Sequence, residues 1–163
     1  MTIALIPGSF DPFHNGHLEV VERATLQFDS VVVAALRNPQ KSEALFDLDQ
    51  RREMMAESMA HLPTVSIVAV STLLVEVAKE VNASAIVKGL RAVSDFESEL
   101  QMAQMNRQLS GVETMFIPSS SSHSFIASRL LREVARYGGD VSAFVPPPVN
   151  RALRKKFEEE GTL

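Results

Sequence analysis

The chain of 163 residues contains no cysteine. Disulfides and thiolate metal sites are therefore excluded, which fits a cytoplasmic location. No apolar run approaches the length that crosses a membrane, and the apolar run at the N-terminus starts too early and lacks the basic lead of a signal peptide. The net charge of −4 argues against a general nucleic-acid binder. We therefore expect a cytoplasmic protein that binds neither membranes nor nucleic acid, and that meets any polyanionic substrate with local positive charge.

The chain offers instead an alternation of short apolar runs and amphipathic patterns. The apolar runs predict buried strands over 3–6, 31–36, 65–70, 85–87 and 114–117. Apolar positions at helical spacing predict helices over 16–28, 47–61, 73–81, 94–109, 124–137 and 149–157. Strands that alternate with helices form right-handed βαβ units. We predict an α/β fold with a doubly wound, five-stranded parallel sheet, Rossmann-like, with a C-terminal helical extension, in a single domain over 1–163.

Capping signals mark the starts of three of these helices. Asp47 with Gln50, and Ser94 with Glu97, have the spacing of capping boxes. Ser124 is the expected N-cap of the fifth helix, because its hydroxyl can accept a hydrogen bond from a free backbone N–H.

One stretch near the N-terminus combines a strand, a tight turn and a helix start. Pro7 and Gly8 stop the strand, and Asp11-Pro12 turns the chain. His14-Asn15-Gly16-His17 then opens a helix, whose free N–H groups and partial positive charge attract anions. The plain alternative is a pair of polar histidines at an ordinary helix start.

Polar and basic side chains follow several predicted strands at the point where each strand ends. Ligands of open parallel sheets bind beyond the carboxyl ends of the strands, so these side chains should share one site. Cations that flank a glycine at a strand end, as Lys88 and Arg91 do, are suited to phosphate. The converging residues are Ser9, His14 and His17 after the first strand, Lys41 after the second, and Lys88 and Arg91 after the fourth, with the loop 118–123 after the fifth.

Several motifs carry a family resemblance. The tetrapeptide 14–17 resembles the HxGH signature of nucleotidylyltransferases, and Gly-Ser-Phe-Asp-Pro at 8–12 resembles their G-[ST]-F-D-P sequence. The blocks 87–91, 95–107 and 124–135 resemble the bacterial phosphopantetheine adenylyltransferase family over nearly the whole chain. This resemblance implies ATP and 4′-phosphopantetheine as substrates, dephospho-coenzyme A and pyrophosphate as products, a requirement for Mg²⁺, and a cytoplasmic homohexamer that serves coenzyme A synthesis.

The resemblance also implies roles for single positions. His17 would stabilise the transition state, with Lys41 and Arg91 in the catalytic set, and no protein ligand for the metal is predicted. The positions that match ATP contacts are Ser9, Phe10, His14, His17, Gly89, Leu90, Arg91, Glu99, His123, Ser124, Phe125, Ile126, Ala127, Ser128 and Arg129. The positions that match phosphopantetheine contacts are Ser9, Lys41, Leu74, Lys88 and Asn106.

The sequence departs from the family pattern at four positions. Ser98 stands where many members have tyrosine. Lys88 stands where other members have arginine; it keeps the positive charge but loses bidentate recognition of phosphate. Ala127 and Arg129 replace hydroxyl residues, so the grip on the triphosphate should differ in detail. Arg129 either contacts the triphosphate or pairs with Glu133 one turn further on.

Simpler interpretations and rival functions stand beside this one. Lys41 could be a solvated loop residue, Leu74 a core residue and Glu99 an exposed helix residue, while Met102 and Met105 are expected in the core. The rival functions are a sister nucleotidylyltransferase that acts on nicotinamide mononucleotide or a small phosphorylated alcohol, and a non-catalytic nucleotide sensor. The intact pair His14 and His17 argues against the sensor.

Overall fold

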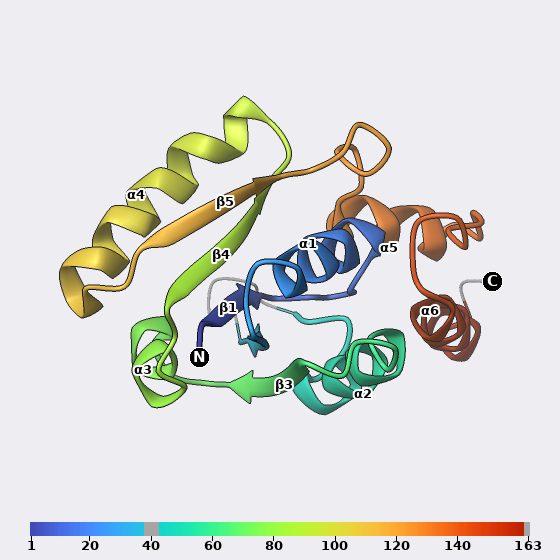
Figure 1. The fold of residues 1–163 in the computed structure, drawn as a ribbon. Helices are drawn as coiled ribbons and strands as arrows, with labels where there is room; N and C mark the ends of the chain where they lie inside the picture. Colours follow the sequence, from blue (N-terminus) through green and yellow to red (C-terminus); the bar gives the residue numbers. More distant parts are fainter. Residues whose placement is uncertain (38–42, 162–163) are drawn as a thin grey trace.

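The computed structural model describes residues 1–37 and 43–161, so the predicted site residue Lys41 lies outside the described part of the chain (Figure 1). Within these ranges, five parallel strands form one sheet in the order β3-β2-β1-β4-β5. Their bounds are β1 (Ile3–Gly8), β2 (Ser30–Leu36), β3 (Val65–Val70), β4 (Ala85–Leu90) and β5 (Thr114–Pro118). The predicted doubly wound parallel sheet is confirmed.

Helices cover both faces of the sheet (Figure 1). They are α1 (Asn15–Thr25), α2 (Leu48–Ser58), α3 (Leu74–Glu80), α4 (Val93–Ser110), α5 (Ser128–Arg136) and α6 (Pro147–Glu159). The helices α1, α2, α5 and α6 share a large hydrophobic core with one face, and α3 packs on the other face beside α4. The predicted C-terminal helix is α6, which buries Val149, Leu153 and Phe157 at a spacing of four.

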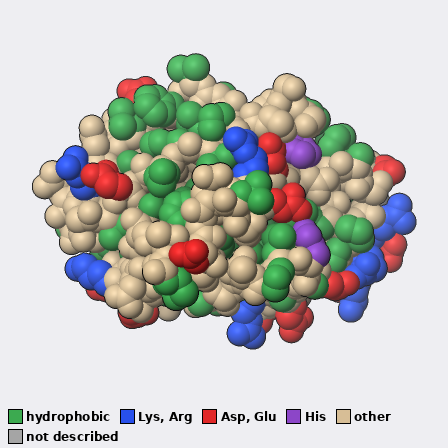
Figure 2. Space-filling model, in the orientation of Figure 1, with side chains coloured by type: hydrophobic (Ala, Val, Ile, Leu, Met, Phe, Trp, Pro, Cys, Tyr) green, Lys and Arg blue, Asp and Glu red, His purple; other side chains and the backbone are tan. Residues whose placement is uncertain are grey.

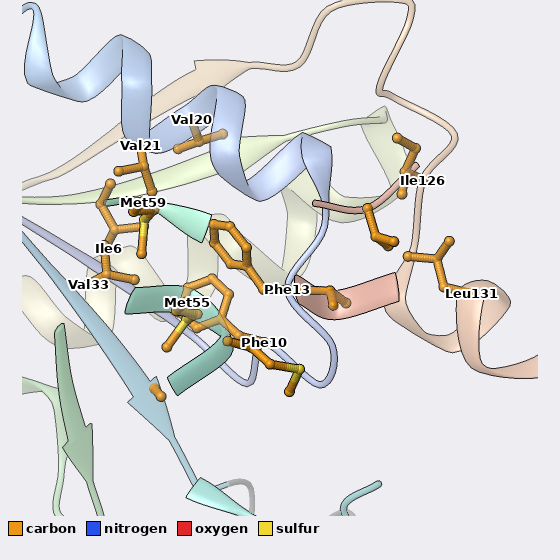
Figure 3. Close-up of a cluster of buried hydrophobic side chains, with 14 of the residues drawn as sticks. Ile6, Phe10, Phe13, Val20, Val21, Val33, Met55, Met59, Ile126 and Leu131 are labelled. Carbon is orange, nitrogen blue, oxygen red and sulfur yellow. The ribbon is translucent and has the colours of Figure 1, made fainter. Parts of the chain in front are cut away.

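The alternation of side chains along the central strand explains the two cores. Ala4 and Ile6 of β1 belong to the larger core, whereas Leu5 between them belongs to the smaller one. The larger core continues beyond the end of β1, where Phe10 and Phe13 pack edge to face beside Met55 of α2 (Figure 3). The turn that follows β1 is therefore fixed in place by the packing of these two rings in the core.

Two strands extend at least two residues further than the apolar runs predicted. β1 continues through Pro7 to Gly8, and β4 continues to Leu90. The pairs Gly8–Ala35 and Gly89–Ile117 keep these ends in register with neighbouring strands. Lys88 is therefore held on a strand and not on a loop.

Two predicted helix starts are wrong. Helix α4 begins at Val93 after the N-cap Ala92, so Ser94 lies inside the helix and forms no capping box; the Arg91–Asp95 ion pair at 3.2 Å spans the actual start. Helix α5 begins at Ser128 after the N-cap Ala127, and the Ser124 hydroxyl donates to the Ser121 carbonyl instead of capping a helix. The predicted capping box of Asp47 and Gln50 is confirmed.

Two methionines of α4 lie at the surface. Met102 and Met105 of α4 are 57% and 58% exposed, so their expected core position is wrong; the buried side chain of that helix is Asn106.

Basic and acidic side chains are interspersed among hydrophobic ones on the face of the molecule seen in Figure 2, so the described residues of this face form no extended positive patch. Of the helices described, none is long and apolar enough to cross a membrane.

Candidate active site

A cavity of about 510 Å³ opens at the carboxyl ends of β1 and β4. These two strands lie side by side at the centre of the sheet, and the chain leaves them toward opposite edges. Such a topological switch point is where open α/β sheets bind ligands. The predicted site residues that line the cavity are Ser9, Phe10, His14, His17, Lys88, Gly89, Arg91, Glu99, Ala127, Ser128 and Arg129.

Other predicted site residues of the described chain lie outside the cavity lining. Leu74 packs against the smaller core, Asn106 is the buried residue of α4, and Ile126 is buried in the larger core. Phe125 is exposed and meets Phe144 edge to face. The remaining ones are Leu90, whose carbonyl accepts from the Ser119 N–H, and the turn residues His123 and Ser124.

Two stacked histidines form one wall of the cavity. The rings of His14 and His17 stack with their centroids 3.5 Å apart. His14 is the N-cap of α1, and its Nδ1 accepts hydrogen bonds from the backbone N–H groups of Gly16 and His17 at 3.1 and 3.3 Å. The Nδ1 of His17 in turn accepts from the His14 N–H at 3.2 Å. Each neutral ring therefore carries its proton on Nε2.

The environment keeps both rings neutral. Burial lowers the pKa of His14 from 6.5 to about 3, with help from the positive charges of Arg91 and His123. Burial also holds the pKa of His17 well below its ordinary value, and His14, Arg91 and Lys88 add to that effect. At neutral pH, His17 therefore presents an Nε2–H donor that cannot act as a cation.

Two glycines and a strained turn permit this arrangement. A Cβ atom on Gly16 would lie 3.0 Å from His14 Cε1, so a side chain there would crowd the capping ring. A Cβ atom on Gly8 would lie 2.8 Å from Phe10 Cζ. Phe10 itself has a φ of 48°, which is costly for a residue with a bulky side chain, and strained residues of this kind cluster at functional sites.

Two basic side chains enter the cavity from β4 and the residue after it. Lys88 Nζ lies 3.3 Å from the Glu99 carboxylate, and both residues line the cavity. Arg91 donates to the Ile126 carbonyl at 3.0 Å and pairs with Asp95. Both cations are thus positioned by neighbours while still facing the cavity.

Buried charges that the sequence reasoning missed support the turn after β1. The Asp11 carboxylate accepts from the Leu45 and Phe46 N–H groups at 2.8 and 2.9 Å, and from Arg132 at 3.1 Å. Arg51, also buried, donates to the Ser9 carbonyl at 2.7 Å. The sequence signals were the place of Asp11 in the Gly-Ser-Phe-Asp-Pro motif and of Arg132 in the block 124–135, whereas nothing local marks Arg51.

The start of α5 contributes another part of the cavity wall. Ala127 is its N-cap without a side-chain cap, and the first helical bond runs from Leu131 to the Ala127 carbonyl. The N–H groups of 128–130 therefore remain for a ligand, next to the positive end of the helix dipole. Neutral N–H donors, two cations and two helix N-termini together suit a chain of phosphates.

A comparison with known families decides the class. The sequence matches the family model described as cytidylyltransferase-like over residues 5–134. The chain belongs to the cytidylyltransferase-like family. This is a family of the nucleotidyltransferase superfamily, and the matched span includes every residue that lines the cavity.

A solved structure agrees with this cytidylyltransferase-like fold. The chain is similar to a bifunctional NMN adenylyltransferase/ADP ribose pyrophosphatase from Francisella tularensis, with a TM-score of 0.72 and 16% identity. The match covers 96% of this chain and 50% of that one, so the chain spans about half the length of that protein. At this identity the likeness shows the fold.

Proposed function

We propose that this nucleotidyltransferase moves AMP from ATP to 4′-phosphopantetheine, with dephospho-coenzyme A and pyrophosphate as products. One observation carries the proposal. Lys88, Gly89, Arg91 and Glu99, which belong to the block that resembles phosphopantetheine adenylyltransferases, line the same cavity as the two histidines. The block most specific for this acceptor and the signature of the superfamily thus share one site.

The reaction requires the protein mainly to position the two substrates and to stabilise the charge that develops on the α-phosphate. The phosphate monoester of the acceptor is mostly dianionic at neutral pH and is already a nucleophile. One of its oxygens forms a bond to the α-phosphorus of ATP, while the bond from that phosphorus to the bridging oxygen of pyrophosphate breaks. No general base is needed, and catalysis rests on in-line alignment and on donors to the developing charge.

The residues of the cavity divide this task. His17 donates its Nε2–H to a non-bridging oxygen of the α-phosphate, where charge grows in the transition state. Lys88 and Arg91 neutralise phosphate charge, and the start of α5 holds the β- and γ-phosphates. Ser9 directly follows β1 and lines the cavity, and the resemblance implies that it contacts both substrates. Lys41, for which the resemblance implies contact with the acceptor phosphate, lies outside the described residues.

Magnesium fits this site as a companion of the triphosphate. Among the described residues, no group of three or more His, Asp or Glu side chains is arranged to hold a metal ion. Mg²⁺ commonly keeps several waters and binds substrate phosphates together with few protein ligands. It would therefore arrive with ATP and reduce the charge of the phosphate chain, while Lys88 and Arg91 supply the positive charge of the protein.

We also propose a cytoplasmic homohexamer, as the resemblance implies. In support, α4 exposes Met102, Met105 and Leu109 by more than half on one side of the helix, and contiguous exposed apolar side chains are typical of protein interfaces. Sedimentation at several concentrations tests the assembly.

A side-by-side assay tests the acceptor. Pyrophosphate release from ATP is measured with phosphopantetheine, nicotinamide mononucleotide and glycerol phosphate at equal concentrations, with CTP as a second nucleotide. We expect ATP with phosphopantetheine to be preferred, and His17→Gln to slow the release by about 10²–10³-fold. A preference for another acceptor or for CTP establishes the sister enzyme instead, and binding without turnover establishes the sensor.

A further inference from the structure

We infer that Glu19 is a positioning residue that holds the segment 119–127 against α1 through Ser120 and His123. By holding this segment, Glu19 positions the cavity wall formed by 127–130 for the nucleotide. The inference rests on the proposed function for its kinetic part. It gives His123 a role through Glu19, in place of the direct contact with ATP that the resemblance implies.

The contacts converge on one carboxylate. Glu19 Oε2 lies 2.7 Å from His123 Nδ1 and 2.9 Å from Ser120 Oγ, and Glu19 Oε1 accepts from the Ser120 N–H at 3.2 Å. The Glu19 side chain is 17% exposed. Burial would raise the pKa of Glu19, but hydrogen bonds from His123 and Ser120 hold it below its ordinary value. The carboxylate is thus charged, shielded and fully engaged with the segment, and charge-assisted hydrogen bonds of this kind are about twice as strong as neutral ones.

A second charged side chain of α1, Arg23, holds the chain next to this segment. Arg23, one turn after Glu19 on α1, lies 3.5 Å from its carboxylate and donates to the Pro118 carbonyl at 2.6 Å. The His123 carbonyl lies 3.6 Å from the place that a Gly16 Cβ would occupy, so the segment passes over the start of α1. The helix that carries His17 therefore also carries the anchor of the cavity wall formed by 127–130.

The anchored residues lie between two stretches that line the cavity. Ser119 lines the cavity on one side of the anchor, and Ala127, Ser128 and Arg129 line it on the other. Within the segment, Ile126 donates to the His123 carbonyl at 3.0 Å, and its own carbonyl accepts from Arg91. A shift of His123 is thus passed along the backbone to Arg91 and to the start of α5, both of which face the phosphates.

Glu19→Gln and His123→Ala test the anchor. We expect each to raise the KM for ATP and the dissociation constant for ATP about tenfold or more, with a smaller effect on the KM for the acceptor, because misplacement by about 1 Å can cost up to about a hundredfold. Backbone amide exchange at Ser120 and Ile126 should accelerate in the free protein. His123→Asn, which can place an amide N–H near the position of Nδ1, should restore much of the loss.

The pair Glu22 and His61 provides the matched control. Glu22 also lies on α1 and contacts His61 Nε2 at 2.9 Å, but both side chains are about half exposed and neither lines the cavity. Glu22→Gln should leave ATP affinity and the exchange of Ser120 unchanged.

The outcomes separate this inference from the proposed function. Amide exchange and calorimetric ATP titration need no acceptor, so they test the anchor even if the wild type turns over none of the three acceptors. Unchanged exchange in Glu19→Gln overturns the anchor. If amide exchange is faster in Glu19→Gln but ATP affinity is unchanged, the positioning role is overturned, and the contacts of Glu19 with Ser120 and His123 serve stability alone.

Discussion

His14 and His17 cap each other at the start of α1: the Nδ1 of each ring accepts the backbone N–H of the other residue. The arrangement has the reciprocal hydrogen bonds of a capping box, in which Ser or Thr usually pairs with Glu or Gln. Here both members are imidazoles, so the cap leaves two Nε2–H groups. The same two hydrogen bonds that begin the helix thus also set the tautomers that face the cavity.

Because of this double role, two substitutions of His17 should separate capping from catalysis. His17→Gln can keep the cap, since its side-chain oxygen can accept the His14 N–H, whereas His17→Ala loses it. We expect both to lower kcat by about 10²–10³-fold, the typical cost of losing one donor to a developing oxyanion. Urea unfolding should show that His17→Ala alone is less stable, by about 1 kcal/mol. Normal turnover with weaker ATP binding would make His17 a ligand of the ground state.

The depressed pKa of His14 predicts a specific dependence of stability on pH. The unfolded chain binds a proton on this ring near pH 6.5, whereas the folded chain does so near pH 3. Between these values the unfolded state holds more protons, so the free energy of unfolding falls as the pH drops. From pH 7 to pH 5, His14 should account for a loss of about 2 kcal/mol.

Asparagine at position 14 tests this titration. His14→Asn retains an N-cap acceptor but cannot be protonated. Urea titrations at pH 8, 7, 6 and 5 should show that the loss below pH 7 is about 2 kcal/mol smaller in the variant, while the difference between the two proteins stays constant from pH 8 to pH 7. Parallel curves over the whole range would contradict the neutral, buried state of the ring.

Gly16→Ala should reduce activity without unfolding the protein. Alanine favours a helix over glycine by about 1 kcal/mol, which offsets part of the crowding of the His14 ring. The ring must shift by a few tenths of an ångström, and its partner His17 moves with it. We expect kcat to fall about tenfold at near wild-type stability in urea. A stable variant with wild-type turnover would show that the exact ring position is unimportant.

Much of the fold was readable from local patterns. Val31 to Ala35 and Ala85 to Val87 are buried on both faces, and such strands stand out as continuous apolar runs. The predicted starts of α4 and α5 failed because other contacts determine where these helices begin. Arg91, which donates to the Ile126 carbonyl, pairs with Asp95 across the start of α4, and Ser120 engages both Glu19 and the amide of Ser124. These contacts override the local preference of a serine for the N-cap.

The site was predictable where topology alone brings residues together. Lys88 lies near the end of β4 and Arg91 directly follows it, beside the strand that precedes His14, so the convergence of parallel strand ends brings them together. The supporting contacts follow no such rule: Asp11 and Arg132 lie 121 positions apart, and Glu19 and His123 lie 104 apart. Pairings of this kind depend on packing details that a single sequence does not display.

Arg129 is the last residue whose role the structure sharpens. Because α5 begins at Ser128, Arg129 lies in the first turn, and it lines the cavity with an exposed side chain. Within the described residues it forms no ion pair with Glu133, one of the two partners that the sequence left open. A guanidinium there can replace the neutral hydrogen bonds of missing hydroxyl groups by a charge-assisted one to the β- or γ-phosphate.

Arg129→Ser restores a hydroxyl and should weaken ATP binding about tenfold at low salt, since a hydrogen bond to a charged group contributes about 1.5–3 kcal/mol and exposure reduces it. AMP, which lacks both outer phosphates, should bind the variant and the wild type equally in calorimetric titrations. The difference for ATP should shrink as salt is added, because screening acts on exposed charges. Arg52→Ser is the matched control: it removes another exposed cation, which pairs with Asp49 away from the cavity, so it corrects for net charge. If Arg129→Ser and Arg52→Ser bound ATP with equal affinity at low salt, Arg129 would act on ATP only through the net charge of the protein, and the direct contact would be contradicted.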